Sequence, residues 1–160
     1  MHPSTEPQAS LRVQFAAGRC AEICAISEVL IALDDAYRAL FRWVRLIDNA
    51  GHAQDACGSV GEEPAKEQSL CLVDIETVAP AQLEVVGIEQ PIARLRSYLA
   101  ERERGAGIES YRNEQIAWLR GDRELLRGAG FSAARIERAV NDLFALFTRL
   151  NSHKEIRLLE

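Results

Sequence analysis

A long apolar stripe between Ala21 and Asn49 limits the possible folds of this chain more than any other part of its sequence. Its large apolar residues recur in steps of four and three, the spacing that lines up one face of an α-helix. The stripe consists of Ile26, Leu30, Leu33, Tyr37, Leu40, Val44 and Ile47. Asp and Arg side chains occupy most of the remaining surface. We therefore expect one long helix over 21–49 with a buried face, ending at Gly51.

Short segments before and after this helix follow the two-residue period of β-strands. Residues 11–16 alternate apolar and polar side chains, which predicts a half-buried strand. Similar runs at 69–78 and 81–86 predict a hairpin, with Gly87 breaking its second strand. In the first run, Cys71, Val73 and Ile75 are expected to share a face. A last alternating run at 155–159 predicts a fourth strand.

Three further helices are expected in the second half of the chain. The first spans 91–104 and begins at Pro91, whose missing N–H costs nothing at a helix start. The second, 110–127, has only a thin apolar stripe, with Tyr111, Trp118 and Leu125 at steps of seven, and is expected to be the most exposed helix. The third, 133–150, has a strong apolar face, which consists of Ile136, Val140, Leu143, Phe147 and Leu150 with Phe144 beside it.

Two glycine-containing segments, 104–108 and 127–131, repeat the pattern Arg-Gly-Ala-Gly before a serine. A phosphate-binding loop would follow a strand and keep a longer motif, and neither condition holds here. Both segments are explained by a glycine that ends one helix and a serine that caps the next. For the second copy, Phe131 and Ile136 flank the predicted cap Ser132 as a hydrophobic staple.

These elements predict an α+β domain in the order strand, helix, strand, strand, three helices, strand. A small antiparallel or mixed sheet of about four strands would pack against the long helix and the C-terminal helix. Residues 1–10 are expected to form a mobile tail, and 11–160 a single domain. The glycine-rich, acidic stretch 51–68 is expected to be a flexible loop within it.

The composition excludes several kinds of partner. The net charge is −5, and nucleic acid or anionic lipid needs an excess of Lys and Arg on the contacting face. Residues 1–90 hold 6 basic and 14 acidic side chains, whereas residues 91–160 hold 13 and 10. Ordinary solvated helix faces are the favoured explanation; the alternatives are attraction between opposite ends in an oligomer and Arg side chains that bind an anionic partner. No apolar run is long enough to span a membrane, and a cytoplasmic location is expected.

The sequence offers no clear catalytic or metal-binding group. Cys20 and Cys24 share a helix face, but structural zinc sites need two such pairs, so buried cysteines acting as small hydrophobes are expected. Asp34 and Asp35 are adjacent on a helix and point about 100° apart, which suits a solvated face better than acid and base catalysis. The three histidines lie in expected tail and loop positions. We expect no cofactor and no metal.

A family resemblance appears in the hairpin region. The run 73–78, followed by 81–85, Gly87 and Pro91, resembles a strand-turn-strand-helix pattern in uncharacterised bacterial accessory domains of an actinobacterial type. That family usually carries Gly-Ser-Pro-Leu at the turn, whereas this chain has Ala-Pro-Ala-Gln-Leu at 79–83. The resemblance implies an accessory or interaction domain of a bacterial conflict system, and it supplies no catalytic residues.

The first functional hypothesis is a non-enzymatic protein-interaction or oligomerisation module. Aromatic and Arg side chains are frequent anchors of protein interfaces, and helix 110–127 carries several of them. The predicted interface residues are Tyr111, Arg112, Trp118, Arg120 and Arg123. The partner would be a second copy of the chain or a larger effector protein.

The alternative hypothesis is a sensor or enzyme for a small anionic ligand. Its pocket would lie between the sheet and the helices, with Tyr37 and Trp43 among the ligand-binding residues. The polar candidates are scattered along the sequence, which favours the interaction module.

Overall fold

The computed structural model describes residues 6–15, 23–50, 64–78, 80–103, 117–153 and 156–159. Their elements are, in chain order, β1 (Gln8–Phe15), α1 (Ile23–Ala50), the 3-10 turn η1 (Lys66–Gln68), β2 (Cys71–Glu76), β3 (Gln82–Ile88), α2 (Glu89–Glu103), α4 (Ala117–Gly128), α5 (Ala133–Ser152) and β4 (Ile156–Leu159). The predicted α+β class and the predicted order of elements are confirmed.

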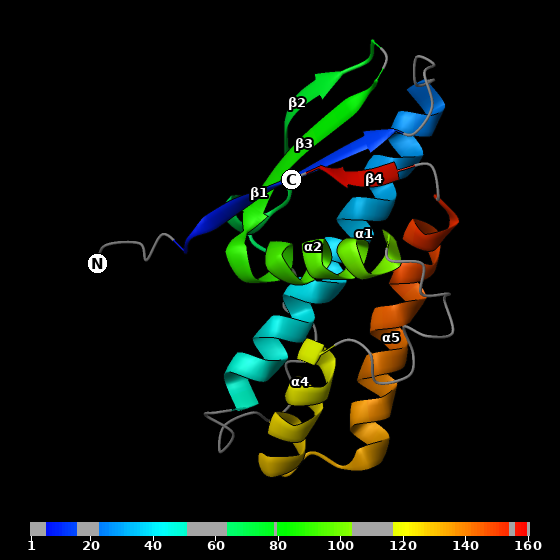
Figure 1. Cartoon of the computed structure of the whole chain (residues 1–160). Helices are drawn as coiled ribbons and strands as arrows, with labels where there is room; N and C mark the ends of the chain where they lie inside the picture. Colours follow the sequence, from blue (N-terminus) through cyan, green and yellow to red (C-terminus); the bar gives the residue numbers. More distant parts are fainter. Residues whose placement is uncertain are drawn as a thin grey trace, which may run out of the picture.

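The four strands form one antiparallel sheet in the order β2-β3-β1-β4. β1 lies in the middle of the sheet, while β2 and β4 are its two edges (Figure 1). This connectivity is the split β-α-β topology, in which two β-α-β units interleave. Leu11, Val13 and Phe15 of β1 are buried, whereas Arg12 between them is exposed, so the sheet has one core face and one open face.

The helices cover the core face. α2 runs across the sheet against β1, β3 and β4, and α1 packs beside both α2 and α5 (Figure 1). The predicted face of α1 is confirmed: Ile26, Leu33, Tyr37, Leu40 and Val44 are buried, and Leu30 and Ile47 pack against the same core. The predicted face of α5 is buried as well, and Phe144 beside it is partly buried against the same core.

The turn between α4 and α5 confirms the predicted helix stop and start. Gly130 has φ of +95°, and its N–H bonds to Arg127 O at 3.0 Å. Phe131 N–H bonds to Leu126 O at 3.0 Å, which completes a Schellman motif. Ser132 then caps α5 by accepting a bond from Arg135 N–H at 3.2 Å. The first glycine segment, 104–108, lies outside the described residues.

Two boundaries differ from the prediction. β1 begins at Gln8 rather than Leu11, and Glu6 before it is bonded to Arg45 of α1, so residues 6–10 of the expected tail are part of the domain. Gly87 does not break β3 but lies inside it, buried and paired with Ala9. Of the expected loop 51–68, residues 51–63 lie outside the described part of the chain.

The predicted stripe of α4 is confirmed only in part. Trp118 is partly buried against the core, whereas Leu125 is 58% exposed, and the buried residues are Leu119, Asp122 and Leu126. The physical reason is that α1 and α2 supply hydrogen-bond partners for the Asp122 carboxylate, so a charged residue can face inward. From sequence periodicity alone, a charged residue such as Asp122 is expected to face solvent.

The prediction of buried cysteines is also wrong for the two that are described. Cys24 and Cys71 are exposed free thiols, whereas Cys20 and Cys57 lie outside the described residues. Cys24 is on the solvent side of the first turn of α1, and Cys71 is at the start of edge strand β2. Within the described ranges, no group of three His, Cys, Asp or Glu residues can hold a metal ion.

Candidate functional site

The structure describes three of the five predicted interface residues on helix 110–127. Tyr111 and Arg112 lie outside the described residues. Trp118 is half-buried against the core, and its ring lies 5.5 Å from the Arg94 guanidinium. Arg123 is bound to Glu137 of α5 at 2.6 Å, and Arg120 is exposed. An interface through Trp118 stays a prediction.

Tyr37, a candidate ligand-binding residue, is fully buried and hydrogen-bonded within the fold. Its hydroxyl donates to Gln68 O at 2.5 Å and accepts from Ile88 N–H at 2.9 Å. Burial raises the pKa of the Tyr37 hydroxyl above its usual value of 10.0, and the bond from Ile88 opposes part of this rise. Through its two hydrogen bonds, the Tyr37 hydroxyl links η1 to the end of β3.

Trp43, the second candidate, is also part of the core. Its indole N–H donates to Asp122 Oδ2 at 2.7 Å, and the Asp122 side chain is only 7% exposed. Arg94 of α2 binds both oxygens of the same carboxylate at 3.1 Å. The three residues connect α1, α2 and α4, which is a structural role. Neither Tyr37 nor Trp43 presents a free polar atom to a ligand.

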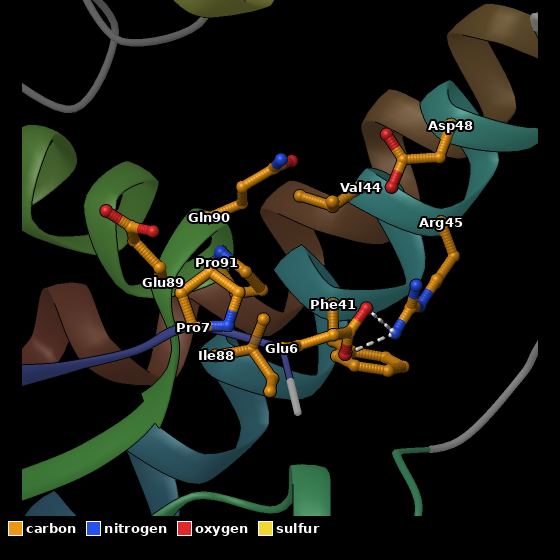
Figure 2. Close-up of a pocket in the computed structure, with 10 residues that line it drawn as sticks. All are labelled: Glu6, Pro7, Phe41, Val44, Arg45, Asp48, Ile88, Glu89, Gln90 and Pro91. Carbon is orange, nitrogen blue, oxygen red and sulfur yellow. Dashed lines mark hydrogen bonds and ion pairs between the residues drawn. The ribbon is translucent and has the colours of Figure 1, made fainter. Parts of the chain in front are cut away.

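A small pocket lies where the start of β1 meets α1 and the start of α2 (Figure 2). Its volume is about 90 Å³. Apolar groups form most of its wall, and Glu6 faces Arg45 at one end, while Asp48 and Glu89 lie apart from that pair (Figure 2). The lining residues are Glu6, Pro7, Phe41, Val44, Arg45, Asp48, Ile88, Glu89, Gln90 and Pro91.

The charges of this pocket are already paired or have the wrong sign for an anion. Arg45 contacts the Glu6 carboxylate at 2.7 and 2.8 Å and lies 4.8 Å from the Phe41 ring centre. Asp48 and Glu89 add negative charge. Pockets for small-molecule ligands usually have about 300–1,000 Å³. This pocket is therefore too small for a metabolite, and its described lining residues offer no free cation to an anionic one.

A wider hollow of about 520 Å³ lies between the C-terminal part of α1 and α4. Its walls are Ile47, Ala50, Gly121, Glu124, Leu125, Gly128 and Ala129. Glu124 is the single ionisable group among these residues, so they offer no convergent polar groups that could orient a substrate. The hollow is therefore a concave surface whose described residues lack the convergent polar groups of a binding site.

The most unusual surface of the described chain is edge strand β2. All six residues of this strand are exposed, whereas the neighbouring β3 alternates between buried and half-buried residues. The exposed apolar side chains are Leu72 at 47%, Val73 at 59%, Ile75 at 39% and Val78, just past the strand, at 76%. We call these four residues the β2 apolar strip. A cluster of this kind on a sheet edge marks a place where another chain can pair.

The opposite edge, β4, is protected from such pairing. Arg102 of α2 donates to Ile156 O at 2.8 Å, and Glu103 accepts a bond from Leu158 N–H. Both backbone groups belong to residues two apart in β4, so they point to the same side, away from β1. Within the described ranges, no side chain of another element forms a hydrogen bond to the backbone of β2. The β4 edge is therefore closed by hydrogen bonds from α2, whereas the β2 edge is open to another strand.

A β-bulge at Val73 determines which side chains of β2 share a face. Leu72 is opposite Val85 and Ile75 is opposite Leu83, so both lie on the core side of the sheet beyond its covered area. A strand of 69–78 was expected, and β2 confirms its position. The predicted face of Cys71, Val73 and Ile75 is wrong because the bulge shifts the alternation by one residue.

The open face of β2 carries two carboxylates. Asp74 is opposite Glu84, and Glu76 is opposite Gln82. Glu84 is neutralised by Arg12 at 3.4 Å. Asp74 accepts a bond from Ile75 N–H at 2.9 Å, and neither Asp74 nor Glu76 forms an ion pair with a residue in the described ranges. The edge therefore combines apolar side chains on one face with unneutralised negative charge on the other.

No protein-family model, curated protein or solved structure matches this chain. The accessory-domain resemblance of the hairpin region therefore stays a prediction. In the described part of the chain, no helix has the length and apolar character needed to cross a bilayer.

Proposed function

We propose that this protein is a non-enzymatic interaction module that binds an extended segment of a partner protein along the free edge of β2. The observation that carries the proposal is the exposure of all six β2 residues together with the β2 apolar strip. Addition of a strand to an open edge uses main-chain hydrogen bonds for affinity and alternate side chains for specificity.

The contrast between the two sheet edges supports the choice of β2. Arg102 and Glu103 satisfy outward backbone groups of β4, which removes that edge as a template. The buried roles of Tyr37 and Trp43 and the small volume of the pocket at Arg45 give no support to a metabolite site. A binding role at β2 is thus better supported than a ligand sensor.

A peptide-library selection against the immobilised full chain tests the proposal. Enriched peptides should bind the wild type and lose most of their affinity for the double variant Leu72→Ser/Ile75→Ser. Ile31→Ser is the matched control, because Ile31 is 50% exposed on α1 and does not belong to the edge. Thermal denaturation of each variant confirms that it is folded.

Two results would refute the proposal. One is a selection that enriches no peptide. The other is a set of enriched peptides that bind the Leu72→Ser/Ile75→Ser variant as tightly as the wild type. Light scattering on the same samples determines whether the partner is a second copy, since a dimer lost in the double variant would identify self-pairing.

A further inference from the structure

We infer that the segment bound at the β2 edge carries a basic-apolar-basic triplet of residues, and this inference rests on the proposed function. The pairing of β2 with β3 places Asp74 and Glu76 on the open face of the sheet. Ile75 between them lies on the core side, 39% exposed. The outer edge therefore presents an acidic-apolar-acidic triplet to any added strand.

The spacing of the partner residues follows from strand geometry. Directly opposite residues in neighbouring strands point to the same face, and successive residues alternate between faces. A strand added beside β2 thus places its residues opposite Glu76 and Asp74 on the open face and the residue between them beside Ile75. Opposite charges across strands are favourable and like charges are unfavourable, so the first and third residues should be Lys or Arg.

The surrounding charges make this preference stronger. Arg12 of β1 is opposite Glu84 and is already bound to it at 3.4 Å. Asp74 lies opposite that same Glu84, so the two carboxylates repel each other across β2 and β3. A basic residue from the partner would relieve this repulsion.

A second copy of the chain is a poorer occupant of this edge. Antiparallel pairing of two β2 strands would bring two copies of Asp74 and Glu76 into one interface, with no cation from either strand. The net charge of −5 on each chain adds to the repulsion. A basic segment of another protein has the complementary charge.

The test uses three fluorescent eight-residue peptides and the full-length protein. The first peptide, Ser-Thr-Lys-Val-Lys-Val-Thr-Ser, carries the triplet, the second has Glu in place of both Lys, and the third has Pro in place of the Val between them. Fluorescence anisotropy at low and moderate salt gives each Kd. Two exposed ion pairs, at roughly two- to fivefold each, predict that the Lys peptide binds about tenfold more tightly than the Glu peptide. Binding of the Pro peptide should be weakened strongly, because Pro has no N–H to donate to the β2 edge and adds steric restriction to the strand.

The variant Asp74→Asn/Glu76→Gln should bind the Lys and Glu peptides equally. Asn keeps an oxygen that can accept the bond from Ile75 N–H, so the strand itself should be preserved. The matched control is Glu28→Gln/Glu124→Gln, which removes the same charge from exposed positions of α1 and α4 and should keep the preference.

The outcomes separate this inference from the proposed function. Equal binding of the Lys and Glu peptides by the wild type, or a preference that survives in the Asp74→Asn/Glu76→Gln variant, overturns the basic triplet and leaves edge binding in place. Failure of both peptides, while library peptides bind in an Ile75-dependent way, also overturns the triplet alone. Failure of the library selection overturns both. A wild-type dimer that depends on Leu72 and Ile75 would instead assign the edge to a second copy.

Discussion

The indole N–H of Trp43 donates a 2.7 Å hydrogen bond to the carboxylate of Asp122, although the two residues are 79 positions apart. Arg94 binds the same carboxylate from α2 at 3.1 Å. A buried anion that is bonded in this way is stable only while its partners are present. The contact therefore couples the position of α4 to α1 and α2.

Replacement of Asp122 should destabilise the domain strongly. Asp122→Ala leaves the Trp43 indole and the Arg94 guanidinium without their acceptor, so we expect the free energy of unfolding to fall by about 3 kcal/mol. Asp122→Asn keeps one acceptor oxygen and should cost less. Urea denaturation measures both values. The control Glu124→Ala, at an exposed position of the same helix, should stay within about 0.5 kcal/mol of the wild type. Equal stability of Asp122→Ala and this control would contradict the structural role.

Two glycines should respond in opposite directions to the same substitution. A Cβ at Gly87 would lie 2.6 Å from Cε2 of Tyr37, so Gly87→Ala forces the ring or the strand to move. We expect a loss of about 1–3 kcal/mol in the free energy of unfolding. Gly121 is in α4, where an added Cβ would meet nothing within 4 Å, and Gly121→Ala should stabilise the protein by about 0.5–1 kcal/mol. Chemical denaturation of both variants checks the signs, and a neutral Gly87→Ala would show that the ring has room to shift.

The stability of the protein should fall at alkaline pH because of Tyr37. Its pKa in the folded state is above the usual value of 10.0, so the folded protein retains this proton where the unfolded chain has lost it. The stabilisation is complete below pH 10 and decreases as the pH rises toward the folded-state pKa. Urea denaturation at a series of pH values measures this slope.

Tyr37→Phe provides the comparison for that slope. The variant should lose about 1–3 kcal/mol at neutral pH, because Ile88 N–H is left buried without its acceptor. Above pH 10 the difference between the wild type and the variant should shrink. A stability difference that stays constant across this pH range would show that folding does not raise the pKa of Tyr37.

Arg102 should protect the β4 edge. Its guanidinium donates to the carbonyl groups of Leu150, His153 and Ile156 at distances of 3.1, 3.3 and 2.8 Å. Arg102→Ala should accelerate hydrogen exchange in β4 while β3 remains protected, with a loss of about 1–3 kcal/mol in the free energy of unfolding.

The matched control for Arg102 is an Arg with a more exposed partner. Arg149 is 57% exposed and binds Asp35 at 2.7 Å, so Arg149→Ala should change the free energy of unfolding by less than about 1 kcal/mol. If both Arg variants accelerated exchange in β4 to the same extent, the protection could not be assigned to Arg102.

Several parts of the fold could be predicted because their signals are local. The apolar stripe of α1, the alternation of β1 and the Gly130 and Ser132 helix boundary depend on residues close together in sequence, and all are confirmed. Burial of one face and capping of a helix end involve the nearest turns of the chain. The class and order of elements follow from such local signals.

Other features required partners from distant elements. The inward position of Asp122 depends on Trp43 and Arg94, and the need for glycine at position 87 depends on the Tyr37 ring. Trp118 likewise packs partly against the core, beside Arg94 of α2. No local pattern encodes these contacts.

The positions of helices and strands follow from the sequence alone, because hydrophobic period and capping chemistry act within a few residues. In contrast, long-range contacts make β2 an open edge, close β4 with α2, and place Asp74 and Glu76 on the same outer face. Strand order and a single bulge set these relationships, and both arise from pairing between segments far apart in the chain. The proposed binding edge is thus a product of tertiary pairing rather than of any local motif.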